Sequence, residues 1–406
     1  MVIVGRSTMM RGGWIAVLLL PSACSSELMD PASGARVPST PPPAVVDPEP
    51  VIEGTGSPGR LRLLTRTEYD RTVEALLGDT TEPARSDVPP ENQLHGFDNG
   101  EAHQASVTHI EAYQRVAVGV AERAVAAGVD LLVGDCVPST NCGYDFIDDF
   151  GRRAFRRPVE QAEREAFRRL FDQVDTMDGF EAAVEVVVQA FLQSPQFLYR
   201  VETGPPADVA TRLSPSAIAT RLAYVHWSAP PDDALLQAAE DGALDTRAGV
   251  EAQVRRLVAD PRAEAGFENF YAQVLETDGF ASMSRDVQLY PMYSADLGLE
   301  LRDSLHAFMD WVFREGGWAG MWSSDRVYAT PRMAQLYDLP TPPGGVLDPV
   351  VGEPGRVHGL LTQPSLMALL AKPDRSGPIV RGVFVLERVL CRTLAPPPPG
   401  GPIVRP

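Results

Sequence analysis

The chain has 406 residues, of which 44% are hydrophobic, which is enough for several compact units with buried cores. Its 54 acidic residues outnumber the 36 basic ones and give a formal net charge of -18. Binding to nucleic acid needs a basic face that displaces counterions from phosphates, so this charge argues against nucleic acid as a partner. Lys372 is the single lysine in the sequence. A GC-rich coding bias explains this preference for arginine more simply than anion recognition does.

The first 24 residues predict a lipoprotein-type signal peptide. Arg6 and Arg11 precede a short apolar stretch, residues 14–20, which has signal-peptide length and is too short to span a bilayer. The stretch ends in LPSAC (residues 20–24), which resembles a bacterial lipobox with proline where leucine is usual. We expect lipidation at Cys24. The alternative is ordinary cleavage before the cysteine, which would leave a free thiol.

The residues after Cys24 predict the destination and a spacer. Ser25 stands where aspartate would favour inner-membrane retention, as in Gram-negative lipoproteins. We therefore expect an exported protein that is anchored to the outer membrane, or lies in the periplasm or at the cell surface of a Gram-negative bacterium. Residues 25–59 are rich in proline and show no apolar periodicity, so we expect a disordered linker.

From Leu61 onward the apolar residues recur with the helical period, which predicts a mainly α fold. We expect helix-on-helix packing in several small consecutive units, with few or no strands, because no hairpin signal separates alternating apolar runs. Thr65 and Glu68 form the pattern of a capping box, and Gly78 is placed to end that first helix. Further helices are expected over residues 101–127, 144–155, 159–174, 179–192, 215–226, 232–239, 246–258, 262–275, 297–313 and 379–390.

Cys136 and Cys142 lie in a turn-rich connector between two predicted helical blocks. In an exported protein this close pair predicts a disulfide, since a metal site would need two more ligands nearby and none is apparent. We therefore expect no metal. Cys391 is left over, either buried on its helix or available to a partner outside this chain.

Catalytic residues stay unknown from the sequence. It contains no Gly-x-Ser-x-Gly, no His-Glu-x-x-His, no Walker loop and no Gly-x-Gly-x-x-Gly after a strand. No two of the six histidines are spaced i,i+4. Asp145, Asp148 and Asp149 suit a hard cation, but they also fall in the first turn of a predicted helix, where carboxylates favour the dipole.

Two arginine-rich patches are candidates for anion binding. The first consists of Arg152, Arg153, Arg156 and Arg157, and the second of Arg375 and Arg381. The alternative for the first patch is a helix C-terminus whose arginines pair with carboxylates such as Asp148, Asp149 or Glu160. For the second patch the alternative is a tight turn with a helix cap.

Several motifs occur in a fixed order: LTRTEY (64–69), FGRRAFRRP (150–158), SPQFLYR (194–200), RLAYVHW (221–227), and HGLLT (358–362) with PIVRG (378–382). Together they resemble large exported proteins of planctomycetes and myxobacteria that carry the domains of unknown function 1587, 1595, 1592 and 1588. These are also called planctomycete-specific and planctomycete cytochrome C domains. The resemblance implies helical domains over residues 60–128, 144–203 and 212–340, and a partial domain over residues 354–406.

The resemblance implies a fold-level grouping and no particular activity. In the family the chain continues past a proline run, here Pro396 to Pro399, into a Cys-x-x-Cys-His haem motif that this sequence lacks. We therefore expect no cofactor in this chain and c-type haem only in longer relatives. His226 and residues 305–311 depart from the family pattern, which weakens the transfer of a polar site to the 297–313 helix.

The expected role is a lipid-anchored scaffold, or an accessory part of an extracytoplasmic system associated with cytochrome c, rather than an enzyme. Its partners would be the membrane and a cytochrome c module or protein. Two alternatives remain: a module that binds or processes an anionic polysaccharide, and a hydrolase with an unrecognised site. The sequence does not give the oligomeric state.

Overall fold

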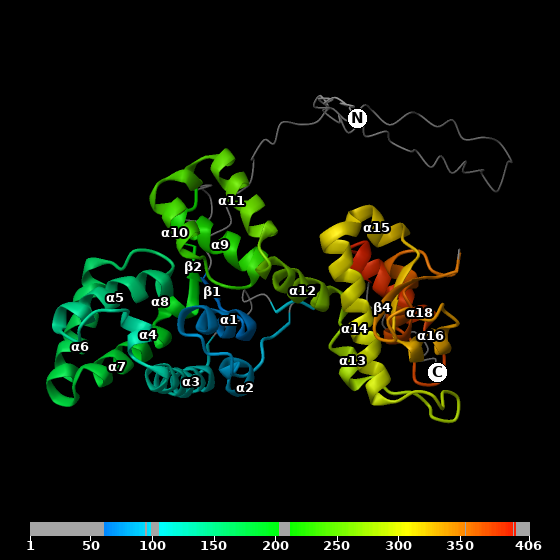
Figure 1. Cartoon of the computed structure of the whole chain (residues 1–406), viewed down its shortest axis with the longest axis horizontal. Helices are drawn as coiled ribbons and strands as arrows, with labels where there is room; N and C mark the ends of the chain where they lie inside the picture. Colours follow the sequence, from blue (N-terminus) through cyan, green and yellow to red (C-terminus); the bar gives the residue numbers. More distant parts are fainter. Residues whose placement is uncertain are drawn as a thin grey trace, which may run out of the picture. The chain divides into compact units, whose positions relative to one another are not determined.

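The computed structural model describes residues 61–93, 96–98, 105–202, 212–353, 355–392 and 394. The predicted signal peptide, the lipidation site at Cys24 and the linker lie outside these residues. Figure 1 shows the described residues as a succession of helices with two small sheets, so the expectation of a mainly α fold is confirmed. None of these helices is long and apolar enough to cross a membrane.

The first hydrophobic core draws on residues from Leu63 to Phe197 and on Tyr224. The regions expected as domains 60–128 and 144–203 therefore share one core, in which α3 and α6 both pack on α7. The elements around it are β1 (Leu61–Leu63), α1 (Arg66–Leu77), α2 (Pro83–Asp87), α3 (Val107–Ala127), α4 (Asp130–Val133), α5 (Thr140–Phe155), α6 (Gln161–Asp178), α7 (Phe180–Gln193), α8 (Pro195–Leu198) and β2 (Tyr199–Val201).

Local sequence signals set the ends of these helices. Thr65 and Glu68 form the predicted capping box of α1, and Gly78 closes that helix in the left-handed conformation at φ 70°. Helix α5 begins at Thr140 because Ser139 caps it, four residues earlier than expected. The interpretation of Asp145, Asp148 and Asp149 as first-turn residues was therefore wrong. The expected 101–127 helix is observed as α3 from Val107, and residues 101–104 lie outside the described residues.

A second, smaller core lies under α9, with Trp227 as its largest fully buried side chain. Helix α12 crosses α9 so closely that a Cβ on Gly266 would lie 2.0 Å from the carbonyl oxygen of His226, a position that only glycine tolerates. The elements of this part are α9 (Pro215–Trp227), α10 (Asp233–Glu240), the 3-10 helix η2 (Ala243–Asp245), α11 (Arg247–Ala259) and α12 (Arg262–Leu275).

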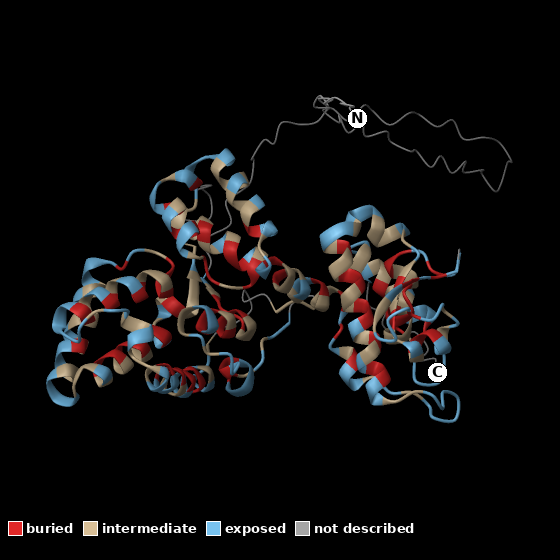
Figure 2. Cartoon of the chain, viewed as in Figure 1, coloured by how far each residue is buried: buried red, intermediate tan, exposed pale blue. Residues whose placement is uncertain are grey.

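The third core is built around α14, which packs on α12, α13, α17 and strand β3. In Figure 2 the buried residues of these helices lie on their inward faces. The elements are α13 (Gly279–Ser282), α14 (Ala295–Trp311), the π-helix η3 (Val312–Gly316), α15 (Gly317–Ser323), β3 (Arg326–Ala329), α16 (Pro331–Tyr337), β4 (Asp348–Val351), the 3-10 helix η4 (Leu360–Thr362), α17 (Pro364–Leu369), α18 (Pro378–Phe384) and the π-helix η5 (Val385–Val389).

Both small sheets are antiparallel pairs of strands far apart in sequence. Strand β1 pairs with β2 in the register Leu61 to Val201, and β3 pairs with β4 in the register Arg326 to Val351. Neither pair is joined by a short hairpin turn, which is why local sequence patterns did not predict these strands. Pairing β1 with β2 brings the start of α1 next to the SPQFLYR motif.

Candidate functional site

A buried polar cluster surrounds Tyr224 of α9. The Tyr224 hydroxyl and Thr72 Oγ1 of α1 share a hydrogen bond of 2.8 Å. The Arg200 guanidinium lies 5.1 Å from the centre of the tyrosine ring and forms a 3.2 Å ion pair with Glu68. Arg156 lies 5.8 Å from the same ring centre. We call these five residues the Tyr224 cluster, and all of them except Thr72 come from the sequence motifs named above, one from each of four motifs.

Arg156, at the C-terminal end of α5, is 2% exposed and lies in the left-handed conformation at φ 60°. Its Nη2 donates to three main-chain carbonyl oxygens, those of Gln196 at 2.8 Å, Phe197 at 3.0 Å and Tyr199 at 3.0 Å. These carbonyls end the short helix α8, so the guanidinium acts as a buried helix cap. Arg156, predicted as a possible anion-binding residue, is thus engaged by main-chain carbonyls of the protein itself.

The other arginines of the first patch point to carboxylates of the chain and do not converge on one site. Arg152 pairs with Asp233 and Glu240, Arg153 with Asp149, and Arg157 with Glu163. Of the carboxylates expected to pair with this patch, Asp149 does so, whereas Asp148 binds Arg164 and Arg168 instead. Hydrogen bonding to Glu163 raises the pKa of Arg157. The structure thus shows internal pairing at these positions.

The two arginines of the second patch have different surroundings. Arg375 is exposed and lies 3.8 Å from Asp374, in a turn closed by a hydrogen bond from the Lys372 N–H to the Arg375 carbonyl. The Arg381 Nη1 instead points to the Met367 sulfur at 3.3 Å. The two guanidiniums therefore do not face a common ligand, and Pro378 occupies the first turn of α18.

Two further arginine contacts tie α9 to its neighbours. Arg71 of α1 donates to the carbonyl oxygens of Trp227 at 3.0 Å and Ala265 at 3.2 Å, and burial lowers its pKa. The Arg262 guanidinium stacks 3.5 Å from the centre of the Trp227 ring. Hydrogen bonds from Arg262 hold the pKa of Asp260 down to about 2. Each contact closes a helix end or covers an aromatic ring.

A cluster of titratable groups lies between α12 and α14 and has no counterpart in the sequence motifs. His306 Nδ1 is 3.0 Å from Glu268 Oε1, and this hydrogen bond lowers the pKa of Glu268. Burial raises the pKa values of Tyr271 and Asp310, whose side chains are 3.4 Å apart. His306 Nε2 is buried and has no hydrogen-bond partner. The i,i+4 spacing of His306 and Asp310 is the sequence pattern that could have predicted this cluster. We considered only pairs of histidines at this spacing and therefore missed it.

A cavity of about 640 Å³ lies beside the C-terminal end of α12. Its lining is mixed: Gln273 and Asp278 provide polar groups, and Leu369, Leu370 and Val380 provide apolar ones. Glu268, His306 and Asp310 do not line it, so the titratable cluster does not open into this cavity. This volume is in the range of small-molecule sites.

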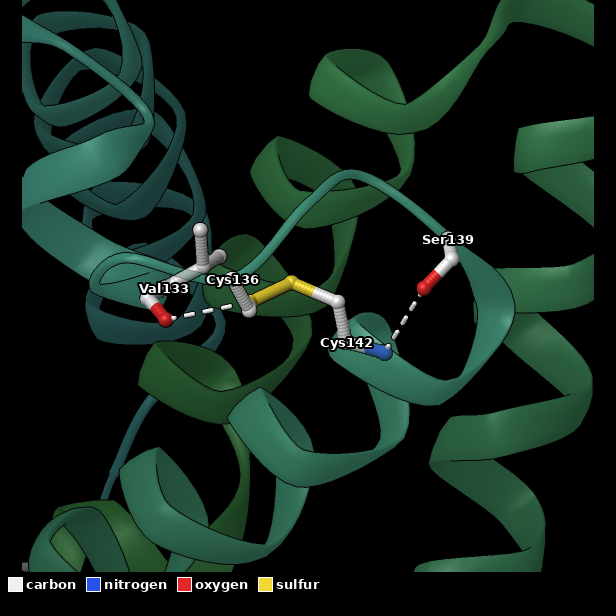
Figure 3. The surroundings of a disulfide bond; sticks show 4 residues. All are labelled: Val133, Cys136, Ser139 and Cys142. Atoms are coloured by element: carbon white, nitrogen blue, oxygen red, sulfur yellow. Dashed lines mark hydrogen bonds between the residues drawn. A yellow bond between two sulfur atoms is a disulfide. The ribbon is translucent and has the colours of Figure 1, made fainter.

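Cys136 and Cys142 form the predicted disulfide, which Figure 3 shows at the start of α5. The Cys142 N–H donates to Ser139 Oγ at 3.3 Å, and the Cys136 sulfur lies 3.3 Å from the Val133 carbonyl oxygen. The bridge therefore connects the end of α4 to the capped first turn of α5. Cys391 is exposed, so of the two expectations for it, burial on its helix was wrong.

Within the described parts of the chain, no group of three or more His, Cys, Asp or Glu side chains is placed to hold a metal ion. Of the three aspartates that suit a hard cation, Asp145, Asp148 and Asp149, the last two are bound by arginines. The buried polar groups described above are thus engaged mainly in connecting helices.

The protein is thus multi-helical, and buried arginines connect its consecutive segments through hydrogen bonds and ion pairs. Comparison with protein-family models gives four matches, each described as a protein of unknown function: PSD3 (DUF1587) over residues 62–126, PSD5 (DUF1595) over 142–202, PSD4 (DUF1592) over 213–339 and PSCyt3 (DUF1588) over 357–406. The chain belongs to the family of proteins that carry this series of domains. No curated protein and no solved structure matches the chain.

Proposed function

We propose that this protein is an exported, lipid-anchored scaffold of the cell envelope, which holds a cytochrome c module or protein for extracytoplasmic electron transfer. The predicted lipobox at Cys24 supports the anchor, and the name of the fourth matching model, PSCyt3, refers to cytochrome C. The scaffold would contribute position and not chemistry, and any haem would belong to the partner.

The observation that carries the proposal is the use of the motif residues. Glu68, Arg156, Arg200 and Tyr224 come from three different matched segments, since Arg156 and Arg200 share one, yet all four meet in one buried cluster. Buried charged groups that are paired in this way fix the relative positions of the elements that supply them. These motif residues therefore hold the first three matched segments together, as a scaffold requires.

The described residues favour neither of the two alternatives, polysaccharide binding and hydrolysis. An anionic polysaccharide would need free guanidiniums, and those of the first patch are bound to carboxylates or carbonyls. A hydrolase would need its acid or base to face a substrate cavity. Instead, His306 Nε2 is buried away from the 640 Å³ cavity.

The first test is purification of the tagged full chain from the membranes of its native host in mild detergent. We expect a c-type haem protein to co-purify in near-stoichiometric amount, seen as a Soret band and by haem staining after electrophoresis. A preparation without haem would overturn the link to cytochrome c. The matched control is the Arg156→Met chain, in which the Tyr224 cluster is broken and from which the haem protein should be lost.

The second test concerns the anchor. Intact-mass measurement of the mature protein should show a diacylated Cys24 as the first residue, and Cys24→Ser should move the protein to the soluble fraction. A mature chain that starts at residue 24 with an unmodified thiol would leave the scaffold without its proposed membrane attachment.

A further inference from the structure

Helices α18 and η5 run on from one another and place one face on the third core. Phe384 is buried, and Val385 and Val389 pack against the core. On the opposite side Ile379 is 81% exposed and Leu390 is 53% exposed. A surface helix normally turns polar residues outward, so this outward face is unusual in being apolar.

The outward apolar residues are Ile379, Val383, Leu386 and Leu390, which we call the outer seam. Their spacing of four, three and four residues is that of the a and d positions of a coiled coil. Val383 and Leu386 are half-buried but do not belong to the core cluster. A Cβ on Gly382 would have no neighbour within 4 Å, so the face is open. An open apolar stripe of this kind marks an interaction surface.

The charges around the outer seam are opposite to those of the whole chain. The net charge of the chain is -18, whereas residues 372–392 contain five cationic and two acidic side chains. Lys372 and Arg375 are exposed before the seam, where Asp374 lies 3.8 Å from Arg375, and Arg392 is exposed after it, whereas Glu387 is exposed within this stretch. Each end of the seam therefore carries a net positive charge.

This charge pattern indicates which kind of partner can bind the outer seam. A second copy docked in parallel would place Arg375 against Arg375 and Arg392 against Arg392, and an antiparallel copy would place Arg375 against Arg392. Both arrangements oppose like charges, whereas an acidic helix would meet cations at both ends. We propose that the outer seam docks an amphipathic helix of a different protein, whose apolar stripe is flanked by acidic residues.

The surface extends beyond the seam itself. Val380, next to Ile379, is 39% exposed and lines the 640 Å³ cavity together with Leu369 and Leu370. A large apolar side chain of the docked helix would have room there. This inference rests on the proposed scaffold role, because the helix would belong to the protein that the scaffold holds.

The probe is a fluorescent synthetic three-heptad peptide with leucine at a and d and glutamate at e and g, titrated with the full mature chain. We expect binding in the low micromolar range that weakens with salt. A peptide with the same core and lysine at e and g should bind at least tenfold more weakly. Equal binding of both peptides, or none of either, would overturn the proposal.

The variant pair Ile379→Asp with Leu390→Asp should weaken the acidic peptide at least tenfold. The matched control is Leu131→Asp with Met177→Asp, two residues that are 77% and 72% exposed on other helices, and it should bind like the parent chain. Circular dichroism checks that both variants fold. If the seam variant binds the peptide normally, the surface is wrongly assigned.

Two further readouts separate the alternatives. Light scattering should show no dimer through the seam, and a dimer that Ile379→Asp dissociates would make a second copy the occupant. Haem co-purification with the parent chain tests the scaffold role independently of the peptide. If haem co-purifies but the peptide fails to bind, the seam is wrongly assigned and the scaffold role stands. If the peptide binds but no haem co-purifies, the seam stands as a docking surface and the scaffold role is overturned.

Discussion

Single side chains in this protein carry unusually large structural roles, and Arg156 is the clearest case. A guanidinium presents five donors in a fixed plane, so Nη2 of Arg156 can donate to three carbonyls while Nη1 lies 3.5 Å from the Tyr224 hydroxyl. The left-handed backbone at this position adds a local cost that the three bonds offset. The same patch looked from its sequence like an anion site, because the acceptors lie about forty residues away along the chain.

Replacing Arg156 by methionine should lower the free energy of unfolding by about 3 kcal/mol, because the buried carbonyls of residues 196, 197 and 199 lose their donor. Arg156→Lys should recover only part of this, since the lysine side chain is shorter and has no counterpart of the Nη1 that lies 3.5 Å from the Tyr224 hydroxyl. Urea denaturation followed by circular dichroism measures both. Arg247→Ala, at an exposed ion pair, is the control and should change the value by less than about 0.5 kcal/mol. A small effect for Arg156→Met would contradict its role as a buried cap.

Asp98 should make stability depend on pH. Burial, and then the nearby Glu68 and Glu91, raise the pKa of Asp98 from 3.8 to about 6. The folded state therefore holds this proton more tightly than the unfolded chain does. Its contribution to stability is complete below about pH 4 and is lost as the pH rises through about 6.

Asp98→Asn should consequently raise the free energy of unfolding at pH 7.5 by about 1 kcal/mol, a figure reduced for partial solvent screening, and should have almost no effect at pH 4. Thermal melts across this pH range measure the difference. Asp178→Asn, on an exposed helix end, is the matched control. The same gain at both pH values would show that charge burial is not the cause.

At the scale of elements, short signals at helix ends determine most of the secondary structure. The capping box at Thr65 and Glu68 sets the start of α1, and Glu68 also pairs with Arg200 of β2. Glu68 thus stabilises both the start of α1 and the β1–β2 sheet. The bridge between Cys136 and Cys142 has a similar position at the start of α5.

Thr65→Ala should lower the free energy of unfolding by about 1 kcal/mol, the usual cost of an N-cap, and Thr65→Ser should restore it. Glu68→Ala should cost about 3 kcal/mol, because it also leaves the poorly exposed Arg200 without its partner. Chemical denaturation of the three variants gives these values. Equal effects of Thr65→Ala and Glu68→Ala would mean that the pair with Arg200 adds nothing.

Reduction of the disulfide should cost about 2 kcal/mol, since the closed loop is short and its entropy contribution small. Thermal melts with and without reductant should therefore differ for the parent chain. They should coincide for the Cys136→Ser and Cys142→Ala double variant. A parent chain that melts identically under both conditions would show that the bridge is not stabilising.

Sequence patterns predicted the helices well where apolar spacing was regular, as in α12, whose bounds Arg262–Leu275 agree with the expected 262–275. They failed for short elements such as α13 and α15, which have too few turns for a period to emerge. They also could not show the Tyr224 cluster, because its members lie up to about 156 residues apart and meet only through tertiary packing. The disulfide was predictable because its cysteines are close in the chain.

For the molecule as a whole, the contacts between the first and second cores determine whether these cores unfold together. Arg71 extends from α1 in the first core to the ends of α9 and α12. Together with the Tyr224 cluster it couples the first core to the second. Coupled cores should unfold in one cooperative transition.

Arg71→Ala should separate this transition into two. The tryptophans at positions 227, 311, 318 and 322 lie outside the first core, so their fluorescence follows the second and third cores. Far-ultraviolet circular dichroism follows all helices. The two probes should coincide in urea for the parent chain and diverge for Arg71→Ala, and coincident curves for the variant would contradict the coupling.

The turn that precedes α18 has a practical consequence. It contains Lys372, which is exposed and is the single lysine of the chain. An amine-reactive reagent can therefore modify the side chain at one position, a few residues before the outer seam. Coupled to a sensor surface through this amine, every molecule would be held in one orientation with the seam against the support. The Cys391 thiol lies at the other end of the seam, so a dye on each residue would give a distance gauge across the docking face.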